Sequence, residues 1–251
     1  MQIMTEGIII RDKTLSNDNH MLSILTKDFG VITAFERQSR QMKNRINSAL
    51  ELFSYSTFVL FYNKERYTVD KADSNKIFFG IREDIEKLSL ASYFSELLLE
   101  LAAEGEEASS YLKLFLNCLA MLESGKRSIS FIKALFELRL VSMAGYMPDL
   151  LGCQVCGQSE GRDLFFLPNT GVIVCQNCLS TYEQEVKIQI SPGELAAMRH
   201  IIYSDINLLF RFTMPEPALV RLSQITENYI LCQLGKTFTS LTFFHSVQLP
   251  Q

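Results

Sequence analysis

The chain has 251 residues, of which 24 are Lys or Arg and 28 are Asp or Glu, so its formal net charge is −4. With 47% hydrophobic residues, 12 glycines and 6 prolines, it is neither a disordered chain nor a collagen-like one. No apolar stretch approaches the roughly 18 residues of a membrane span, and the first residues do not resemble a secretory signal. We therefore expect a cytoplasmic protein of one large or two ordinary domains, without a membrane partner.

The charges are distributed unevenly along the chain. Residues 1–80 carry 11 basic and 9 acidic side chains, a net charge of +2, whereas residues 81–251 carry 13 and 19, a net charge of −6. A mildly basic first part and an acidic second part indicate two surfaces that meet different partners.

The first 80 residues are typical of strands. Short apolar and β-branched runs are separated by turn residues, and in the longest run Phe53, Tyr55, Val59 and Phe61 share one face with a period of two. The expected strands cover residues 7–11, 20–26, 31–35, 53–62 and 66–70. Five short strands fit a small closed barrel or a sandwich, and a five-stranded OB-type barrel is the natural match in size. We expect this barrel to form a domain over residues 1–80.

Helical spacing replaces the alternation from about residue 81. Apolar residues recur at intervals of three and four, with serine caps and glycine stops at the ends. The expected helices cover residues 89–104, 109–125, 130–144 and 217–234, and a further helix begins at Pro192. Residues 236–251 receive no assignment. We expect residues 81–251 to form an all-helical domain, so the fold class is α+β with more than one domain.

Four of the six cysteines form two pairs with metal-ligand spacing. Two residues separate Cys153 from Cys156 and Cys175 from Cys178, and eighteen residues lie between the pairs. Two such knuckles place four thiolates around one ion at about 2.3 Å, which fills a tetrahedral shell. Residues 164–167 and 172–174 are expected to form a hairpin that returns the second knuckle to the first. We predict one structural Zn²⁺ in a zinc-ribbon-like insertion at residues 153–178.

Other interpretations of the cysteines stay open. The four cysteines could instead form a redox dithiol, a disulfide pair or a vestigial site that has lost its metal. A redox motif would need one knuckle and not two, and disulfides are rare in a cytosolic chain. A full thiolate shell leaves no position for a substrate, so catalytic zinc is not expected. Cys118 and Cys232 fall on apolar faces of expected helices, and we expect both to be small buried hydrophobic residues.

A basic stretch follows the third expected strand, and two more cations lie on the hairpin between the fourth and fifth. Such cations can follow a phosphate backbone along the rim of a barrel, and the hairpin tyrosines can stack on unpaired bases. The candidate DNA-binding residues are Arg37, Arg40, Lys43, Arg45, Lys64, Arg66 and Tyr67, with Tyr62 beside them. The alternative is a solvated basic loop beside ordinary core aromatics.

The chain shows no complete catalytic motif. Gly235, Lys236 and Thr237 match only the end of a phosphate-binding loop, and they follow a helix where such a loop must follow a strand. The serine-hydrolase elbow and the zinc-protease motif are missing, and the three histidines are isolated in the sequence. We therefore expect no enzyme; a zinc hydrolase or nuclease is the weaker alternative.

Six segments appear in a characteristic order along the chain. They are residues 6–11 (EGIIIR), 26–30 (TKDFG), 93–97 (YFSEL), 136–140 (FELRL), 145–148 (GYMP) and 153–157 (CQVCG). In these segments the chain resembles the RecO family of bacterial recombination mediators. The resemblance spans nearly the whole chain, and the succession of helix, Gly-Tyr-x-Pro and cysteine knuckle is its most specific part.

The resemblance implies an N-terminal OB barrel followed by a helical domain that holds the knuckles. It implies binding of single- and double-stranded DNA, annealing of complementary strands and, with RecR, loading of RecA onto strands coated by single-stranded-DNA-binding protein. RecF is a further candidate partner, and the location would be the cytoplasm at the nucleoid. Arg37, Arg40 and Lys43 fall where the family has its basic segment. Some members lack the cysteines, so zinc would support the fold.

The helical domain is expected to offer an apolar, partly basic groove to the acidic, aromatic-ended tail of single-stranded-DNA-binding protein. The candidate anchors for this tail are Arg127, Lys133, Arg139, Arg199 and Arg221. The alternative from another class is a zinc-ribbon adaptor that makes no direct DNA contact. Annealing of strands at low salt distinguishes the two.

Overall fold

The computed structural model describes residues 1–15, 19–36, 48–161 and 163–248. Its contacts divide the chain into two compact units. Unit 1 consists of Met1–Ser124 and Phe238–Gln251, and unit 2 of Gly125–Thr237. The domain boundary expected near residue 80 falls inside unit 1, beside the short helix α1 (Phe79–Arg82), and a division there stays a prediction.

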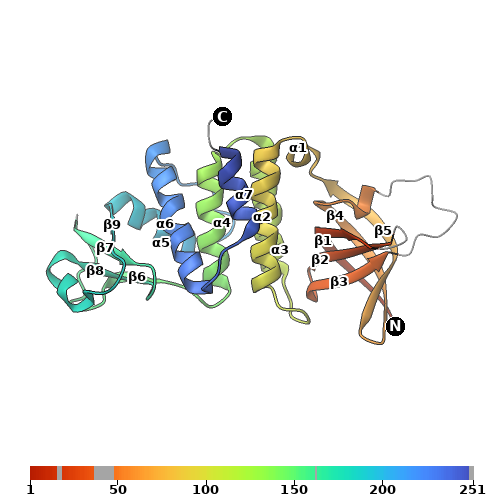
Figure 1. The fold of residues 1–251 in the computed structure, drawn as a ribbon, viewed down its shortest axis with the longest axis horizontal. Coiled ribbons are helices and arrows are strands. Elements are labelled where there is room, and N and C mark those ends of the chain that lie inside the picture. The colour runs from red at the N-terminus through yellow and green to blue at the C-terminus, as the bar shows by residue number, and fades with distance from the viewer. Residues whose placement is uncertain (16–18, 37–47, 162, 249–251) are drawn as a thin grey trace. The chain divides into compact units, whose positions relative to one another are not determined.

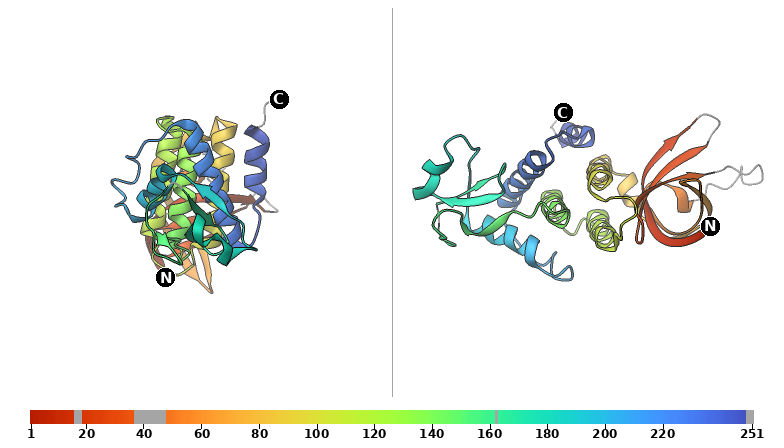
Figure 2. Two further views of the ribbon diagram at one scale, coloured as in Figure 1. Left: turned by 90° about the vertical axis from the view of Figure 1, so that its left-hand side faces the viewer. Right: turned by 90° about the horizontal axis from the view of Figure 1, so that it is seen from below.

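Unit 1 begins with a closed five-stranded barrel in the order β1-β2-β3-β5-β4 (Figure 1). Its strands are β1 (Gln2–Thr14), β2 (His20–Thr26), β3 (Gly30–Glu36), β4 (Ser54–Asn63) and β5 (Arg66–Ile77). β1 closes the barrel because its first half pairs with β4 and its second half with β2. A bulge between Ile9 and Arg11 bends it between these two partners. The ring of strands is visible in the right-hand view of Figure 2, and the expected OB-type barrel is confirmed.

The interior of the barrel is filled by one side of each strand. Ile9, Leu22, Ile24, Ile32 and Phe58 are at most 1% exposed, and they point to the interior because successive side chains of a strand lie on opposite faces. β5 continues to Ile77, seven residues beyond the expected end, because its pairing with β4 uses main-chain groups that need no apolar side chains.

The helices of unit 1 come from both ends of the chain: α1, α2 (Ile85–Leu101), α3 (Ser109–Ser124) and α7 (Thr239–Gln248). A short 3-10 turn, η2 (Ser48–Leu50), precedes β4. The α7 helix, which the sequence left unassigned, lies along α2 (Figure 1). Both the backbone N–H and the hydroxyl of Ser240 donate to the Glu96 carboxylate, and the Gln248 amide donates to Glu86 at 2.9 Å.

The loop between α2 and α3 is bonded to the turn between β2 and β3. The N–H of Gly105 donates to the Phe29 carbonyl at 3.0 Å, and that of Ala108 to the Lys27 carbonyl at 2.9 Å. Gly30 has φ +63°, and a Cβ there would lie 1.8 Å from the Ala103 carbonyl oxygen. Glycine is therefore required at this turn for both its conformation and its size.

Unit 2 combines helices with a small sheet. Its helices are α4 (Ile129–Met143), α5 (Pro192–Tyr203) and α6 (Glu216–Leu234), and the 3-10 helix is η3 (Gln176–Tyr182). The sheet has the order β6-β8-β7-β9, formed by β6 (Asp149–Cys153), β7 (Leu164–Leu167), β8 (Val172–Cys175) and β9 (Ile188–Ile190). The expected β7–β8 hairpin is confirmed. The sequence did not indicate β6 and β9, because such short strands depend on pairing rather than on a periodic pattern. Within the described ranges, no helix is long and apolar enough to cross a membrane.

Candidate metal centre and nucleic-acid interface

The two cysteine pairs meet at one place in unit 2. Cys153 ends β6 and Cys175 ends β8, while Cys156 follows β6 and Cys178 lies in η3. The four Sγ atoms all lie within 4.8 Å of one another, and those of Cys156 and Cys175 are 3.7 Å apart. Tetrahedral thiolates at 2.3 Å from one zinc ion have sulfur separations of about 3.8 Å. The sulfurs therefore fit a four-coordinate ion.

The backbone around Cys153 favours the thiolate form of this cysteine, whereas hydrogen bonding with the Cys175 thiol raises the pKa of Cys178 to about 12. Burial raises the pKa of the Cys153 thiol, but backbone N–H groups of Cys156, Cys175 and Val155 outweigh it and lower the pKa to about 6. One of them, the N–H of Cys175, donates to Cys153 Sγ at 3.3 Å. Metal binding requires deprotonated sulfur. With all four positions taken by cysteine, an ion held here has no open position for a substrate.

The other two cysteines lie outside this cluster. Cys118 in α3 is fully buried, as expected. The expectation that Cys232 is buried is wrong, because Cys232 lies on a side of α6, near its end, that is exposed to solvent.

The candidate DNA-binding residues divide into two groups. Arg37, Arg40, Lys43 and Arg45 lie outside the described residues, in the stretch that follows the end of β3. Lys64 and Arg66 are exposed at the β4–β5 hairpin, where Lys64 and Glu65 both have positive φ.

The two tyrosines of the hairpin differ in burial. Their rings lie 4.7 Å apart, but Tyr62 is 36% exposed and Tyr67 only 9%. Tyr67 belongs to the barrel core, so Tyr62 is the ring that is accessible to a ligand.

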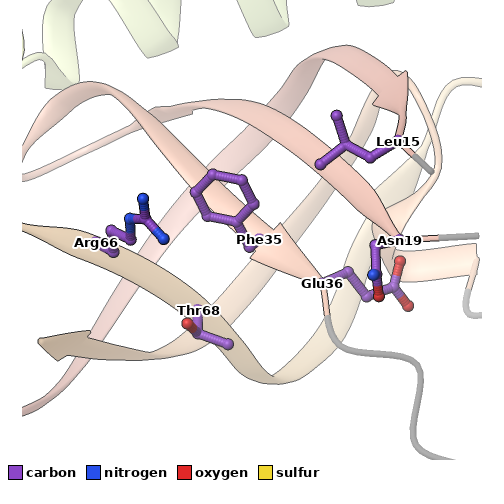
Figure 3. A pocket seen from close by; sticks show the side chains of 6 residues that line it. All are labelled: Leu15, Asn19, Phe35, Glu36, Arg66 and Thr68. Carbon is purple, nitrogen blue, oxygen red and sulfur yellow. The ribbon is translucent and has the colours of Figure 1, made fainter. Parts of the chain in front are cut away.

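A hollow of about 240 Å³, which we call the rim pocket, lies on the barrel close to this hairpin (Figure 3). It is lined by Leu15, Asn19, Phe35, Glu36, Arg66 and Thr68. Phe35 and Thr68 are register partners in the parallel pairing of β3 with β5. Because the neighbouring Ala34 is fully buried, Phe35 points away from the interior. The sequence does not predict this pocket; the one signal it contains is Phe35, an aromatic residue in an outward-facing position of β3.

The five cations that were expected to anchor a partner all make contacts inside unit 2. Arg127 donates to the Phe210 carbonyl at 2.7 Å and Arg139 to that of Ile201 at 3.1 Å. Arg199 donates to the Leu150 carbonyl at 2.8 Å.

The remaining two cations form ion pairs. Arg221 binds Glu194 at 3.0 Å, and the side chain of Lys133, only 3% exposed, binds Glu137 at 2.8 Å. Each of the five cations therefore has a hydrogen-bond or ion-pair partner within unit 2, so each has a structural role there. A role in partner binding stays a prediction, and the burial of Lys133 leaves it little surface for one.

Two family models match successive parts of the chain. The model described as Recombination protein O N terminal matches residues 1–78, and that described as Recombination protein O C terminal matches residues 82–242. The chain belongs to the RecO family. Curated members named DNA repair protein RecO match almost end to end. The protein of Acetivibrio thermocellus is 32% identical over 245 residues, which cover 98% of this chain and 97% of the relative. That of Alkaliphilus metalliredigens is 29% identical, with 96% and 98% covered.

The Gly-Tyr-x-Pro segment of this RecO-family chain has a structural role. Gly145, with φ +96°, follows the end of α4, and the N–H of Tyr146 then donates to the Val141 carbonyl at 3.0 Å. The Tyr146 carbonyl accepts a hydrogen bond from the Tyr229 hydroxyl of α6 at 2.8 Å. The segment thus turns the chain from α4 into the sheet of β6 to β9 and attaches the turn to α6.

Proposed function

We propose that this RecO-family chain is a non-catalytic mediator of DNA repair and recombination that binds single- and double-stranded DNA through its barrel. The observation that carries the proposal is the match of both family models, in order, over nearly the whole chain. Relatives that match almost end to end are named DNA repair protein RecO. In this role the chain acts in the cytoplasm, at the nucleoid.

The DNA path follows one side of the barrel. It begins at the exposed Lys64 and Arg66 of the β4–β5 hairpin and includes the cations of residues 37–45, which follow β3 in the sequence. The exposed ring of Tyr62 offers a surface on which an unpaired base can stack. Phosphate contacts can hold single or double strands because both have a phosphate backbone, and these contacts carry no sequence information.

The mediator brings two strands together because the cations of the barrel neutralise the phosphate charges of both strands. It anneals complementary strands and, with RecR, helps RecA replace single-stranded-DNA-binding protein. The acidic tail of that protein is the proposed partner of the second unit. A bound Zn²⁺, held by Cys153, Cys156, Cys175 and Cys178, would join the β6–β8 pair to η3 and so stabilise unit 2 without a part in the exchange of strands.

The first experiment measures the binding of a fluorescent single strand as the salt concentration is raised. Neutralising about four phosphates gives a slope of about −3 in a plot of log affinity against log salt. Changing Arg37, Arg40 and Lys43 to glutamate should abolish most of the affinity and flatten this slope. The matched control changes Lys126, Arg211 and Lys236, which are exposed in unit 2, to glutamate. It alters the net charge equally and should leave the slope unchanged.

Unchanged affinity in the barrel variant would contradict the proposed DNA path. Equal losses in both variants would show that only the overall charge matters. A second experiment follows annealing of complementary strands precoated with the cognate single-stranded-DNA-binding protein. Failure to anneal at low salt would favour the adaptor that makes no DNA contact.

A further inference from the structure

The rim pocket combines an aromatic ring, a cation and a carboxylate within one small hollow (Figure 3). We propose that it holds one unpaired base of a DNA single strand and that it prefers guanine. This inference rests on the proposed function, because it requires that the barrel bind DNA. It adds a sequence preference that phosphate contacts by themselves do not provide.

The size of the pocket limits its ligand. Sites for small molecules usually span about 300–1,000 Å³. The rim pocket, at about 240 Å³, lies below this range and is open to solvent on one side. It therefore suits one planar ring system, with the sugar and the phosphate remaining outside, better than it suits a whole dinucleotide or cofactor.

Phe35 supplies the surface for stacking. Its side chain is half-buried and points out of the barrel, where a base can lie against the ring. The guanidinium carbon of Arg66 lies 5.9 Å from the centre of this ring. Arg66 lies to one side of Phe35, and Asn19 and Glu36 lie to the other (Figure 3). A base on Phe35 thus has a phosphate-binding cation at one end and polar side chains at the other.

Glu36 is the group that selects the base. Its carboxylate forms no hydrogen bond with any residue that the structure describes, and it is half-buried at the pocket wall. An ionised carboxylate only accepts hydrogen bonds. Guanine alone presents two adjacent donors, N1–H and the N2 amino group, on its Watson–Crick edge. Cytosine and adenine present one amino group next to a ring acceptor, and thymine presents one N–H between two carbonyls. The carboxylate therefore favours guanine most and thymine least.

The test measures fluorescence anisotropy with a short oligothymidine strand and with the same strand carrying one central guanine. The native chain should bind the guanine-containing strand about 5- to 100-fold more tightly, which is the discrimination of a good bidentate contact. Glu36→Gln, which offers one donor and one acceptor, should remove this preference. Glu65→Gln is the matched control, because it removes the same charge at the tip of the hairpin and should keep the preference.

A second pair of variants tests the stacking surface. Phe35→Ala should weaken the binding of every strand by about 5- to 100-fold. Phe35→Leu keeps an apolar side chain without a ring and should show a similar loss, which separates stacking from folding. The proposed role of the rim pocket would be wrong if the native chain bound both strands equally, or if the guanine preference survived Glu36→Gln. Either result would leave the proposal of DNA binding intact. Binding of neither strand would overturn the proposed function as well.

Discussion

Lys133 and Glu137, one helical turn apart on α4, form an ion pair of 2.8 Å with both side chains at most 3% exposed. Glu137 also accepts a hydrogen bond from the Thr226 hydroxyl at 2.7 Å, and Lys133 binds Glu227 at 2.7 Å. Both additional partners belong to α6. The buried charges therefore connect the two helices whose packing forms the centre of unit 2.

Removing one member of this pair should destabilise unit 2 strongly. Lys133→Met leaves the Glu137 carboxylate buried without its cation, and the expected loss of unfolding free energy is about 3–5 kcal/mol. Replacing both residues, as Lys133→Met with Glu137→Leu, should cost clearly less than the sum of the single changes. Chemical denaturation of the three variants measures this coupling. If the loss of unfolding free energy in the double variant equals the sum of the two single losses, the two residues are not coupled and the prediction is wrong.

The cysteine cluster predicts one Zn²⁺ per chain, measurable as metal content after purification. Cys175→Ser should remove the ion and unfold the sheet of β6 to β9, and a strong chelator should do the same, because structural zinc contributes directly to folding. Cys232→Ser is the control, since this exposed cysteine lies outside the cluster and its loss should leave the metal content unchanged. A folded, metal-free native protein would contradict the prediction.

The turn at Gly30 provides a test of how the barrel is held to the α2–α3 loop. In Gly30→Ala, the alanine must adopt the left-handed backbone conformation of Gly30, and its Cβ clashes with the Ala103 carbonyl oxygen. We therefore expect a loss of about 2–4 kcal/mol in the stability of unit 1. Gly105→Ala is the comparison, because Gly105 has φ +87° but no atom within 4 Å of an added Cβ. It should cost only about 1–2 kcal/mol. Thermal or chemical unfolding of both variants shows whether the clash with Ala103 costs stability beyond the cost of the positive φ that both glycines share.

The guanine preference should depend on pH. Burial raises the pKa of Glu36 above its ordinary 4.5, a nearby His20 lowers it and Asp12 raises it again. As the pH falls through this raised pKa, the carboxylate takes up a proton and ceases to be a pure acceptor. The preference should therefore decline at a pH above 4.5, where an unperturbed glutamate would still be mostly charged.

Other ionisable side chains lie near the Glu36 carboxylate or line the pocket, namely His20, Asp12 and Arg66. His20 Nδ1 lies 2.8 Å from the Asp12 carboxylate, and these groups should affect the binding of every strand alike. The ratio of affinities for strands with and without guanine isolates Glu36, and Glu36→Gln should make this ratio independent of pH. A ratio that stays constant in the native chain down to pH 4.5 would contradict the assignment.

The sequence by itself determined the barrel, most helices and the four cysteines that cluster in unit 2. Short runs of apolar residues bounded by turn residues, at 20–26 and 31–35, were sufficient for two strands, because such side chains pack well on a pleated, buried surface. The serine cap and proline at residues 191–192 were sufficient for the start of α5, because these signals act over a few neighbouring residues. Cysteine spacing identified the four residues whose sulfurs meet, because the geometry of one ion restricts which spacings can form a metal site.

Only the tertiary structure decided which polar residues are structural and where a ligand can be bound. Arg139, Arg199 and Lys133 looked like surface cations, but their partners lie tens of residues away in the chain and appear only after folding. The rim pocket assembles Asn19, Phe35 and Arg66 from three separate strands or loops. Local patterns record the preferences of neighbouring residues, whereas such sites depend on which strands pair and in which register.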